Sequence, residues 1–270
     1  MLYGICSPAG KLAQTFPVKY EDTPSCINSP GYNGTVNYGE EIFVGYRYYD
    51  KKGIEPAFPF GYGLTYTTFT MNTAASGFTF DADTDNVIEI LVTVKNTGDR
   101  DGSEVVQLYV GQHRPFVEKP IRELRGFVKV FLKPGQQTTV SIPLKRDAFT
   151  HYDEEKGGWC VEPGDYTVYI GSSSRELPIE LPVTVSGRNI YGIGAHTTIN
   201  KIAESDYAVE CLCAIMPDFK ERIPEFLRDF NGEALVQVYD AIMSDYYINP
   251  IHGAIVFENA CKKMNQDCAL

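Results

Sequence analysis

Between residues 70 and 187 the apolar residues recur with a period of two, and this alternation constrains the fold more than any other feature of the sequence. In the run from Val87 to Lys95, positions 88, 90, 92 and 94 are apolar, whereas 89, 93 and 95 are polar. Such alternation predicts a strand with one buried face. Similar runs follow at 104–110, 125–132, 138–144, 165–171 and 179–185.

Turn-forming residues separate these runs. They are Asn96-Thr97-Gly98-Asp99, Lys133-Pro134-Gly135-Gln136 and Glu162-Pro163-Gly164-Asp165. Short strands at this spacing, with no helical pattern between them, disfavour a parallel α/β sheet. We therefore predict a mainly β protein whose residues 70–187 form a fibronectin III-like or immunoglobulin-like sandwich.

Residues 1–69 differ in character, because they are rich in Pro, Gly and Tyr and show little periodicity. Recurrent Pro and Gly exclude a long helix. A stretch of this length without regular structure is too long for a loop inside a compact domain. We expect extended chain and loops that lie over another surface, and we expect the packing partner that provides this surface to be missing from this chain.

Residues 197–270 change again to apolar spacings of three and four. This pattern predicts helices over 199–215, 218–229, 231–246 and 251–265, with breaks at Pro217, Pro224 and Asn249-Pro250. A helical extension of about 70 residues is marginal as an independent fold, so we expect it to lean on the rest of the protein.

Charge and cysteine usage exclude several classes of protein. The net charge of −11 argues against nucleic acid or an anionic membrane as partner. No apolar run is long enough to span a bilayer, and residues 1–17 do not resemble a signal peptide. We predict a cytoplasmic location, with a signal peptide on a longer parent chain left open.

The seven cysteines are irregularly spaced, which is typical of a reducing compartment. The pairs Cys211/Cys213 and Cys261/Cys268 lack zinc-site spacing, and their apolar surroundings favour buried structural thiols. His113, His151, His196 and His252 show no ligand spacing either. We predict no metal and no cofactor.

Several motifs resemble glycoside hydrolase family 3, most of whose characterised members are β-glucosidases. The runs GEEIFVGYRYYD at 39–50 and PFGYGLTYTTF at 59–69 resemble the end of that family's second, α/β sandwich domain. VKNTG at 94–98 and GSEVVQLYV at 102–110, with LRGF at 124–127 and LKPG at 132–135, resemble its fibronectin type III-like domain. The resemblance covers about residues 1–186, and the helical tail resembles an extension in some bacterial members.

This resemblance implies three parts: residues 1–69 as the end of the α/β sandwich domain, 70–187 as the fibronectin type III-like domain, and 197–270 as the helical extension. In the family, a (β/α)8-like barrel of about 250 residues supplies the nucleophile, and the α/β domain commonly supplies the acid/base carboxylate. Retaining hydrolysis needs these two carboxyl groups about 5–5.5 Å apart.

Neither catalytic role transfers to a residue of this chain, so we predict no catalytic residue and no activity of the chain alone. It is then a structural module of a β-glucosidase-like enzyme, whose partners are the catalytic domains, joined covalently or split. The sequence departs from the family at Ala9, Ala13 and Glu41, where Ser, Pro and Gly are more frequent.

Arg47, flanked by Tyr46 and Tyr48, is the candidate for saccharide binding. Tyrosine faces stack on the C–H surfaces of sugars, and a guanidinium donates in a fixed fork to hydroxyl or carboxylate acceptors. The alternative is an interdomain anchor, in which the aromatic rings are buried and Arg47 pairs with a carboxylate.

Other candidate sites are better explained structurally. We expect Glu40 and Glu41 to anchor a loop rather than to form a catalytic pair, and residues 61–64 to form a tight turn rather than a phosphate loop. Trp159 is expected in the core or at an interface rather than as an exposed sugar ligand. The glycosylation pattern Asn33-Gly34-Thr35 has no role in a cytoplasmic protein.

Two alternatives to the structural module stay open. One is a non-catalytic β-sandwich module that binds carbohydrate or protein, for which an exposed aromatic row would be the sign. The other is an unfolded remnant without function, whose uncovered apolar N-terminal segment promotes aggregation.

Overall fold

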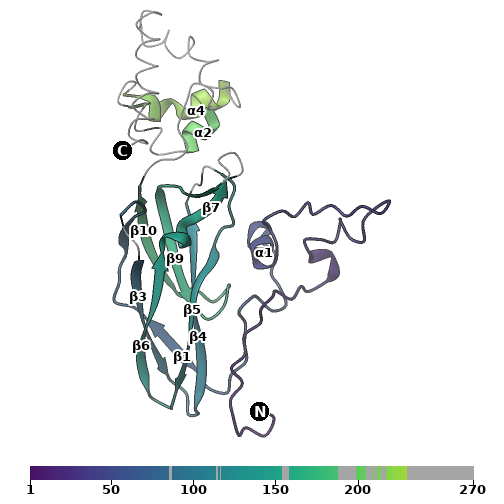
Figure 1. Ribbon diagram of the computed structural model, residues 1–270, viewed down its shortest axis with the longest axis vertical. Coiled ribbons are helices and arrows are strands. Elements are labelled where there is room, and N and C mark those ends of the chain that lie inside the picture. Colours follow the sequence, from purple (N-terminus) through teal and green to yellow (C-terminus); the bar gives the residue numbers. More distant parts are fainter. Residues whose placement is uncertain are drawn as a thin grey trace, which may run out of the picture. The chain divides into compact units, whose positions relative to one another are not determined.

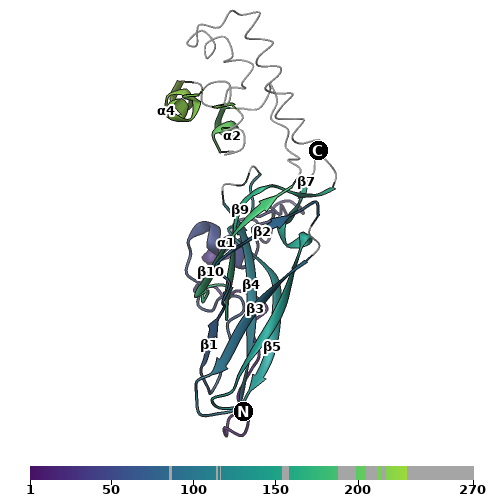
Figure 2. The ribbon, with the colours of Figure 1, turned by 90° about the vertical axis from the view of Figure 1, so that its left-hand side faces the viewer.

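A computed structural model describes residues 1–84, 87–113, 115, 117–153, 158–187, 199–204, 209, 212–213 and 217–229. Strands dominate it, as Figures 1 and 2 show. The elements in chain order are η1 Tyr20–Asp22, α1 Tyr46–Lys52, β1 Phe69–Asn72, β2 Phe78–Asp81, β3 Val87–Asn96, β4 Gly102–Gln112, β5 Glu123–Leu132, β6 Gln137–Lys145, η2 Arg146–Phe149, β7 Thr150–Asp153, β8 Gly158–Val161, β9 Gly164–Gly171, β10 Ile179–Ser186, α2 Ile199–Glu204 and α4 Phe219–Asp229.

The chain divides into two units. The first comprises Met1–His113, Lys119–Phe149 and Asp165–Val185, and the second comprises Arg114–Glu118, Thr150–Gly164 and Ser186–Leu270. The first therefore holds the β-sandwich together with the N-terminal segment, which we define as residues 1–68. The second holds β7, β8, α2 and α4.

The sandwich is built from a three-stranded sheet of order β1-β3-β6 and a five-stranded sheet of order β2-β10-β9-β4-β5. The strand pairs β3/β6, β4/β5 and β4/β9 are all antiparallel. Alternate apolar residues from both sheets meet between them, which removes them from water and supplies the main stabilisation. Those with no exposed surface are Val92, Val94, Val106, Leu108, Leu144, Val168 and Ile170. The predicted mainly β sandwich is thus confirmed.

The turn at residues 96–99 closes one end of the sandwich around a fully buried asparagine. The side-chain carbonyl of Asn96 accepts hydrogen bonds from Thr67 Oγ1 at 2.6 Å and from the Gly98 N–H at 3.0 Å. Its amide donates to the carbonyls of Arg100 and Leu132, at 2.8 and 3.0 Å. All four bonding positions of this buried amide are satisfied, so the motif holds the β3–β4 connection rather than a ligand.

The N-terminal segment is mostly extended. Residues near Leu12 and Phe16 run antiparallel to residues near Phe58 and Tyr62, through hydrogen bonds from Leu12 N–H to Tyr62 O and from Phe16 N–H to Phe58 O, both 2.8 Å. The helix α1 was not predicted, because seven residues are too few to show a helical period. It ends at Gly53, whose φ of +63° is the left-handed conformation that glycine adopts without strain.

In the second unit, β7 and β8 form a two-stranded antiparallel sheet, and α2 contacts α4. Pro224 lies inside α4, so the predicted break there is wrong. The proline removes one backbone hydrogen bond, but the helix carries Phe219 and Phe226, both buried, with ring centroids 5.4 Å apart, on either side of it. The predicted helices over 231–246 and 251–265 lie outside the described residues.

Three smaller expectations can also be compared with the structure. Cys213 is half-buried rather than buried, whereas Cys211, Cys261 and Cys268 lie outside the described residues. The helices within the described part of the chain are too short or too polar to cross a membrane. The side-chain amide of Asn28 donates to Glu40 Oε2 at 3.4 Å, as expected for a loop-anchoring carboxylate.

Candidate functional site

The outward face of β4 carries side chains that are buried although they point away from the sandwich core. Gln107 and Tyr109 alternate with the core residues Val106 and Leu108, yet they are only 3% and 0% exposed. The N-terminal segment covers them: the Tyr46 ring lies 5.8 Å from Tyr109, edge to face, measured between centroids. Figure 1 shows α1 beside the strands β4 and β5. We call this contact, formed by Tyr46, Asp50, Gln107, Tyr109, Arg122 and Arg175, the anchor.

Tyr46, the first residue of α1, enters the anchor with both its ring and its hydroxyl. The ring packs against Phe60 at 4.9 Å, and the hydroxyl oxygen accepts a hydrogen bond from the Leu124 N–H at 2.8 Å. Burial raises the pKa of Tyr46, mainly by desolvation of the phenolate. The phenol of Tyr46 is therefore neutral in the folded protein, and its oxygen accepts the hydrogen bond of a backbone N–H of β5.

Asp50 occupies the next turn of α1 and meets two arginines from the sandwich. Its Oδ2 accepts a hydrogen bond from Arg122 Nε at 3.0 Å, and its Oδ1 lies 3.3 Å from Arg175 Nη2, an ion-pair contact without hydrogen-bond geometry. The Asp50 side chain is only 1% exposed. Arg175 also donates a hydrogen bond to the Ile54 carbonyl at 2.9 Å. It therefore contacts both Asp50, in the last turn of α1, and Ile54, just after the helix.

Gln107 connects three parts of the unit by its side-chain amide. Its Nε2 donates to the carbonyls of Gly61, at 3.1 Å, and of Ser172. Its Oε1 accepts from the Tyr109 hydroxyl at 2.6 Å. Burial raises the pKa of Tyr109 strongly, which keeps this phenol a donor. Gly61 approaches so closely that a Cβ there would collide with the Gln107 amide, and its φ is +78°.

Of the three residues predicted for saccharide binding, Tyr46 and Arg47 contact β5, whereas Tyr48 contacts its own helix. Arg47 Nη2 pairs with Glu123 Oε1 at 2.9 Å, and Arg125 Nη2 pairs with the other oxygen of Glu123 at 2.6 Å. Tyr48 stacks edge to face on Tyr49, at 5.7 Å between centroids. The geometry has the features of the alternative interpretation, in which aromatic rings are buried and Arg47 meets a carboxylate. No bound sugar tests the saccharide role, which stays a prediction.

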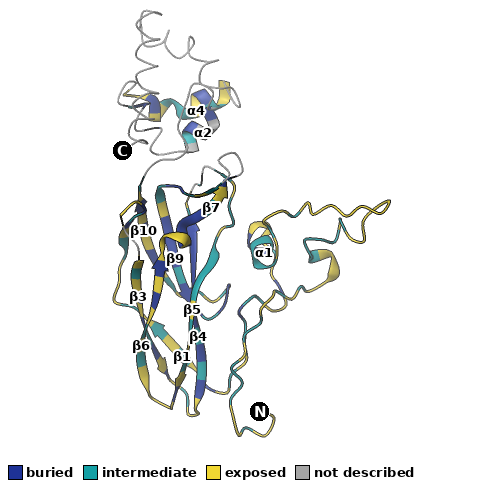
Figure 3. Ribbon diagram, viewed as in Figure 1, coloured by how far each residue is buried: buried dark blue, intermediate teal, exposed yellow. Residues whose placement is uncertain are grey.

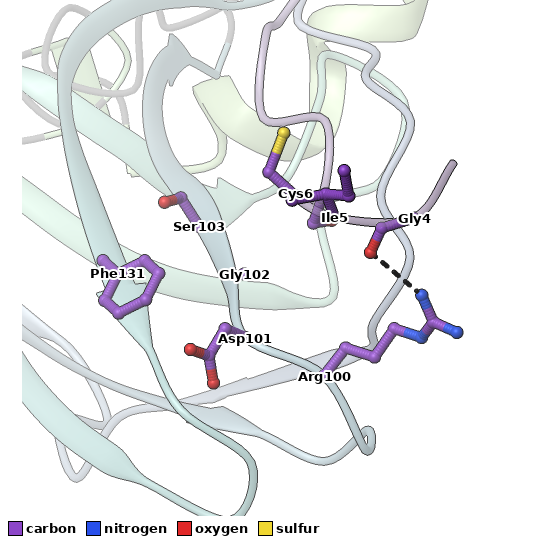
Figure 4. A pocket seen from close by; sticks show the side chains of 9 residues that line it. Gly4, Ile5, Cys6, Arg100, Asp101, Gly102, Ser103 and Phe131 are labelled. Atoms are coloured by element: carbon purple, nitrogen blue, oxygen red, sulfur yellow. Dashed lines mark hydrogen bonds between the residues drawn. The ribbon is translucent and has the colours of Figure 1, made fainter. Parts of the chain in front are cut away.

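A second contact holds the start of the N-terminal segment against the sandwich. Lys11 Nζ lies 2.7 Å from Glu104 Oε1, and Lys129 Nζ donates to the Ala9 carbonyl at 2.8 Å. An open pocket of about 430 Å³ lies beside it, between residues 4–7, residues 100–103 and Phe131. Figure 4 shows that Arg100 turns across it to donate to the Gly4 carbonyl, at 3.4 Å. Lys11, Lys129 and Arg100 thus hold the start of the N-terminal segment against the sandwich.

Much of the N-terminal segment is exposed, as its yellow stretches in Figure 3 show, and many of the exposed residues are large and apolar. A free-standing soluble protein rarely leaves so many large apolar residues uncovered along one segment. Those at least 89% exposed are Leu2, Tyr3, Ile5, Ile27 and Tyr32. The segment therefore combines residues that bind the sandwich with exposed apolar residues that are suited to another protein surface.

Within the described residues no cluster of His, Cys, Asp or Glu is arranged to hold a metal ion. Residues 61–64 form the predicted turn, with the Tyr62 N–H bonded to Pro59 O at 3.1 Å. Trp159 is 65% exposed, so it does not lie in the core, and the other expected place, an interface, stays a prediction. Sequence reasoning missed Asp50, Gln107, Arg122 and Arg175; the one available signal was a polar Gln107 inside an otherwise apolar run.

Residues 104–174 match the fibronectin type III-like domain. The chain is 40% identical over 228 residues to thermostable β-glucosidase B of Acetivibrio thermocellus, covering 84% of this chain and 30% of that protein. It is 49% identical over 179 residues to a β-glucosidase of Kluyveromyces marxianus, covering 66% of this chain and 21% of that one. A match of 228 residues extends past residue 187, so the Acetivibrio protein shares part of the helical tail.

Solved structures show the same likeness. The GH3 β-glucosidase of Bifidobacterium adolescentis has a TM-score of 0.67 and 39% identity, covering 78% of this chain and 31% of that one. The Kluyveromyces marxianus β-glucosidase has a TM-score of 0.64 and 45% identity, covering 69% and 22%. An exo-α-(1→6)-L-arabinopyranosidase of Bifidobacterium breve is also similar, at 44% identity over 187 residues. The chain spans less than a third of the length of these relatives.

Proposed function

The chain corresponds to the C-terminal part of a family 3 glycoside hydrolase, and we propose that it is the non-catalytic module that braces the catalytic domains of that enzyme. In this role the sandwich is a rigid support. The N-terminal segment is the end of the preceding domain, fastened to the support by the anchor. The catalytic domains cover the exposed apolar residues of that segment.

One observation carries this proposal: the carboxylate of Asp50, with its side chain 1% exposed, lies between two arginines of the sandwich. An ion pair at this depth is costly to form unless both partners are held in place, and costly to break once formed. Such a contact joins two parts of a protein permanently. It also keeps the Asp50 carboxylate out of contact with solvent.

The reaction of the whole enzyme is part of the proposal. The relatives include β-glucosidases and exo-α-(1→6)-L-arabinopyranosidases, so we assign the parent to hydrolysis of terminal glycosidic bonds, with a β-glucoside as first substrate to test. Neither catalytic carboxylate is assigned to this chain. The cytoplasmic location stays a prediction.

A chimera tests the bracing role. The C-terminal part of the Acetivibrio β-glucosidase is replaced by this chain, and hydrolysis of p-nitrophenyl β-glucoside is measured. We expect the chimera to be active, the chain alone to be inactive, and Asp50→Asn to hasten thermal inactivation of the chimera with unchanged KM. Glu180→Gln, at an exposed position of β10, is the matched control. Turnover by the chain alone, or an unchanged inactivation rate in Asp50→Asn, would contradict the proposal.

The same chimera tests the saccharide role of Arg47, Tyr46 and Tyr48. The Arg47 side chain is 34% exposed, and a guanidinium has five N–H donors, so its pair with Glu123 leaves donors for a hydroxyl. If Arg47 binds the sugar, Arg47→Met raises KM, and Arg47→Lys, which keeps the charge but not the fork, raises it less. An unchanged KM in Arg47→Met would mean that Arg47 joins the N-terminal segment to the sandwich and does not bind the sugar.

A further inference from the structure

The two-stranded sheet of the second unit presents an aromatic pair to solvent. Tyr152 of β7 and Trp159 of β8 are directly opposite in the antiparallel register, so both side chains emerge from the same face. They are 54% and 65% exposed. Their ring centroids lie 5.7 Å apart with an interplanar angle of 77°, so the two rings form a corner.

Within the described residues of β7 and β8, this exposure is confined to the two rings. The other described residues of β7 and β8 are buried or half-buried, with Thr150 and Val161 below 9% exposed beside the pair. Aromatic residues of this size are costly to leave in water. The polar groups of the two side chains also have no partner among the described residues. The side chains of Tyr152 and Trp159 take part only in their mutual ring contact. The pair thus offers apolar faces together with an unused indole N–H and an unused phenol.

The exposed area and the charge of this surface indicate which class of ligand it can bind. A fully buried aromatic side chain contributes about 150–250 Å², so two partly exposed rings fall well short of the roughly 800 Å² per partner that a stable protein interface needs. The net charge of −11 disfavours polyanions and anionic lipid. A neutral pyranose fits both limits. Its C–H face stacks on one ring of the corner, and its hydroxyl groups bond the indole N–H and the phenol at the rim.

We propose that Tyr152 and Trp159 form a binding site for a neutral saccharide chain, with the pyranose C–H face as the recognised element. This inference does not rest on the bracing role, because it concerns binding by the second unit and not hydrolysis or the anchor. An oligosaccharide with equatorial hydroxyl groups, such as cellotetraose, presents the flattest C–H faces and is the probe of choice.

The chain supplies its own reporter, because Trp159 is its one tryptophan. Cellotetraose is titrated into the full chain while indole fluorescence is excited selectively. We expect a saturable change in intensity with a blue shift as the exposed indole is covered. Tyr152→Ala should weaken binding at least about tenfold, or about 1.4 kcal/mol, whereas Tyr152→Phe, which keeps the ring, should weaken it less. Phe127→Ala, at a 68% exposed position of β5, is the control and should bind normally.

Trp159→Phe and Trp159→Ala, followed by calorimetry, complete the series, with circular dichroism to verify folding. We expect Trp159→Phe to retain part of the affinity and Trp159→Ala to lose it. The proposal is overturned if cellotetraose gives no saturable signal, or if Tyr152→Ala binds as tightly as the unchanged chain. It is overturned equally if the fluorescence shifts with protein concentration in the absence of sugar, because a second copy then covers the pair.

Discussion

The carboxylate of Asp50 and the guanidinium of Arg122 meet at 3.0 Å, although 72 residues separate them in the chain. Asp50 lies on the helix of the N-terminal segment, and Arg122 precedes β5 of the sandwich. The Asp50 side chain is 1% exposed and that of Arg122 is 19% exposed. This pair is therefore one of the contacts that join the N-terminal segment to the sandwich, and removing either charge leaves the other without this partner.

Asp50→Asn should release the N-terminal segment. Since one partner of the pair is buried and the other partly exposed, we expect a loss between that of a surface pair and that of a buried one, about 2–3 kcal/mol. This corresponds to a roughly 30- to 150-fold larger population of the released segment. Limited proteolysis within residues 1–68 measures it, because cleavage follows the open population. Unaltered cleavage, relative to Glu180→Gln, would rule out the anchor as the main attachment.

Gln107→Leu should destabilise the unit more than Tyr109→Phe. The leucine leaves the carbonyls of Gly61 and Ser172 and the hydroxyl of Tyr109 without a partner, at a cost of about 1–3 kcal/mol each before relaxation. Tyr109→Phe leaves only one acceptor unpaired. Urea unfolding of both variants and of the double variant measures the difference. The double variant should be less destabilised than the sum, because the two residues share one hydrogen bond.

Gly61→Ala should be more harmful than Gly53→Ala. Both glycines have positive φ, +78° and +63°, so an alanine is strained at either position. Only at Gly61 does the added Cβ meet another group, the Gln107 amide, whereas nothing lies within 4 Å of a Cβ at Gly53. We expect an additional loss of about 1–3 kcal/mol at Gly61. Equal unfolding free energies of the two variants would show that Gln107 adapts at no cost.

Stability should fall in alkaline solution because of the buried phenols. Burial raises the pKa of Tyr46 and, more strongly, of Tyr109 above the ordinary value of about 10. The folded state therefore binds these protons more tightly than the unfolded state. Its advantage is complete below about pH 10 and is lost as pH rises through the folded-state pKa.

Urea unfolding over an alkaline pH series tests this titration. The free energy of unfolding should decrease above about pH 10, by up to about 1.4 kcal/mol per pH unit for each tyrosine. Tyr109→Phe should show a shallower decrease than Tyr3→Phe, whose ring is 93% exposed. Identical slopes in these two variants would mean that Tyr109 does not carry the effect.

The strands of the sandwich could be predicted from local pattern alone. The predicted run 104–110 lies within β4, and the run 179–185 lies within β10, because alternation of apolar and polar residues reports directly which side of a strand meets the core. The turn at Asn96 was equally local. Short elements such as α1 and β7 were not predicted, because four to seven residues are too few to show a clear periodicity.

The covering of the outer face of β4 could not be predicted in this way. The sequence determined the strand that carries Gln107 and Tyr109, and the charges of Asp50 and Arg122. Only the tertiary structure decided that the N-terminal segment buries the first pair and joins the second, and that Trp159 remains in solvent. Local periodicity records the face of a strand on which a residue lies. What covers that face depends on segments distant in the chain, whose packing is set by shape and charge complementarity.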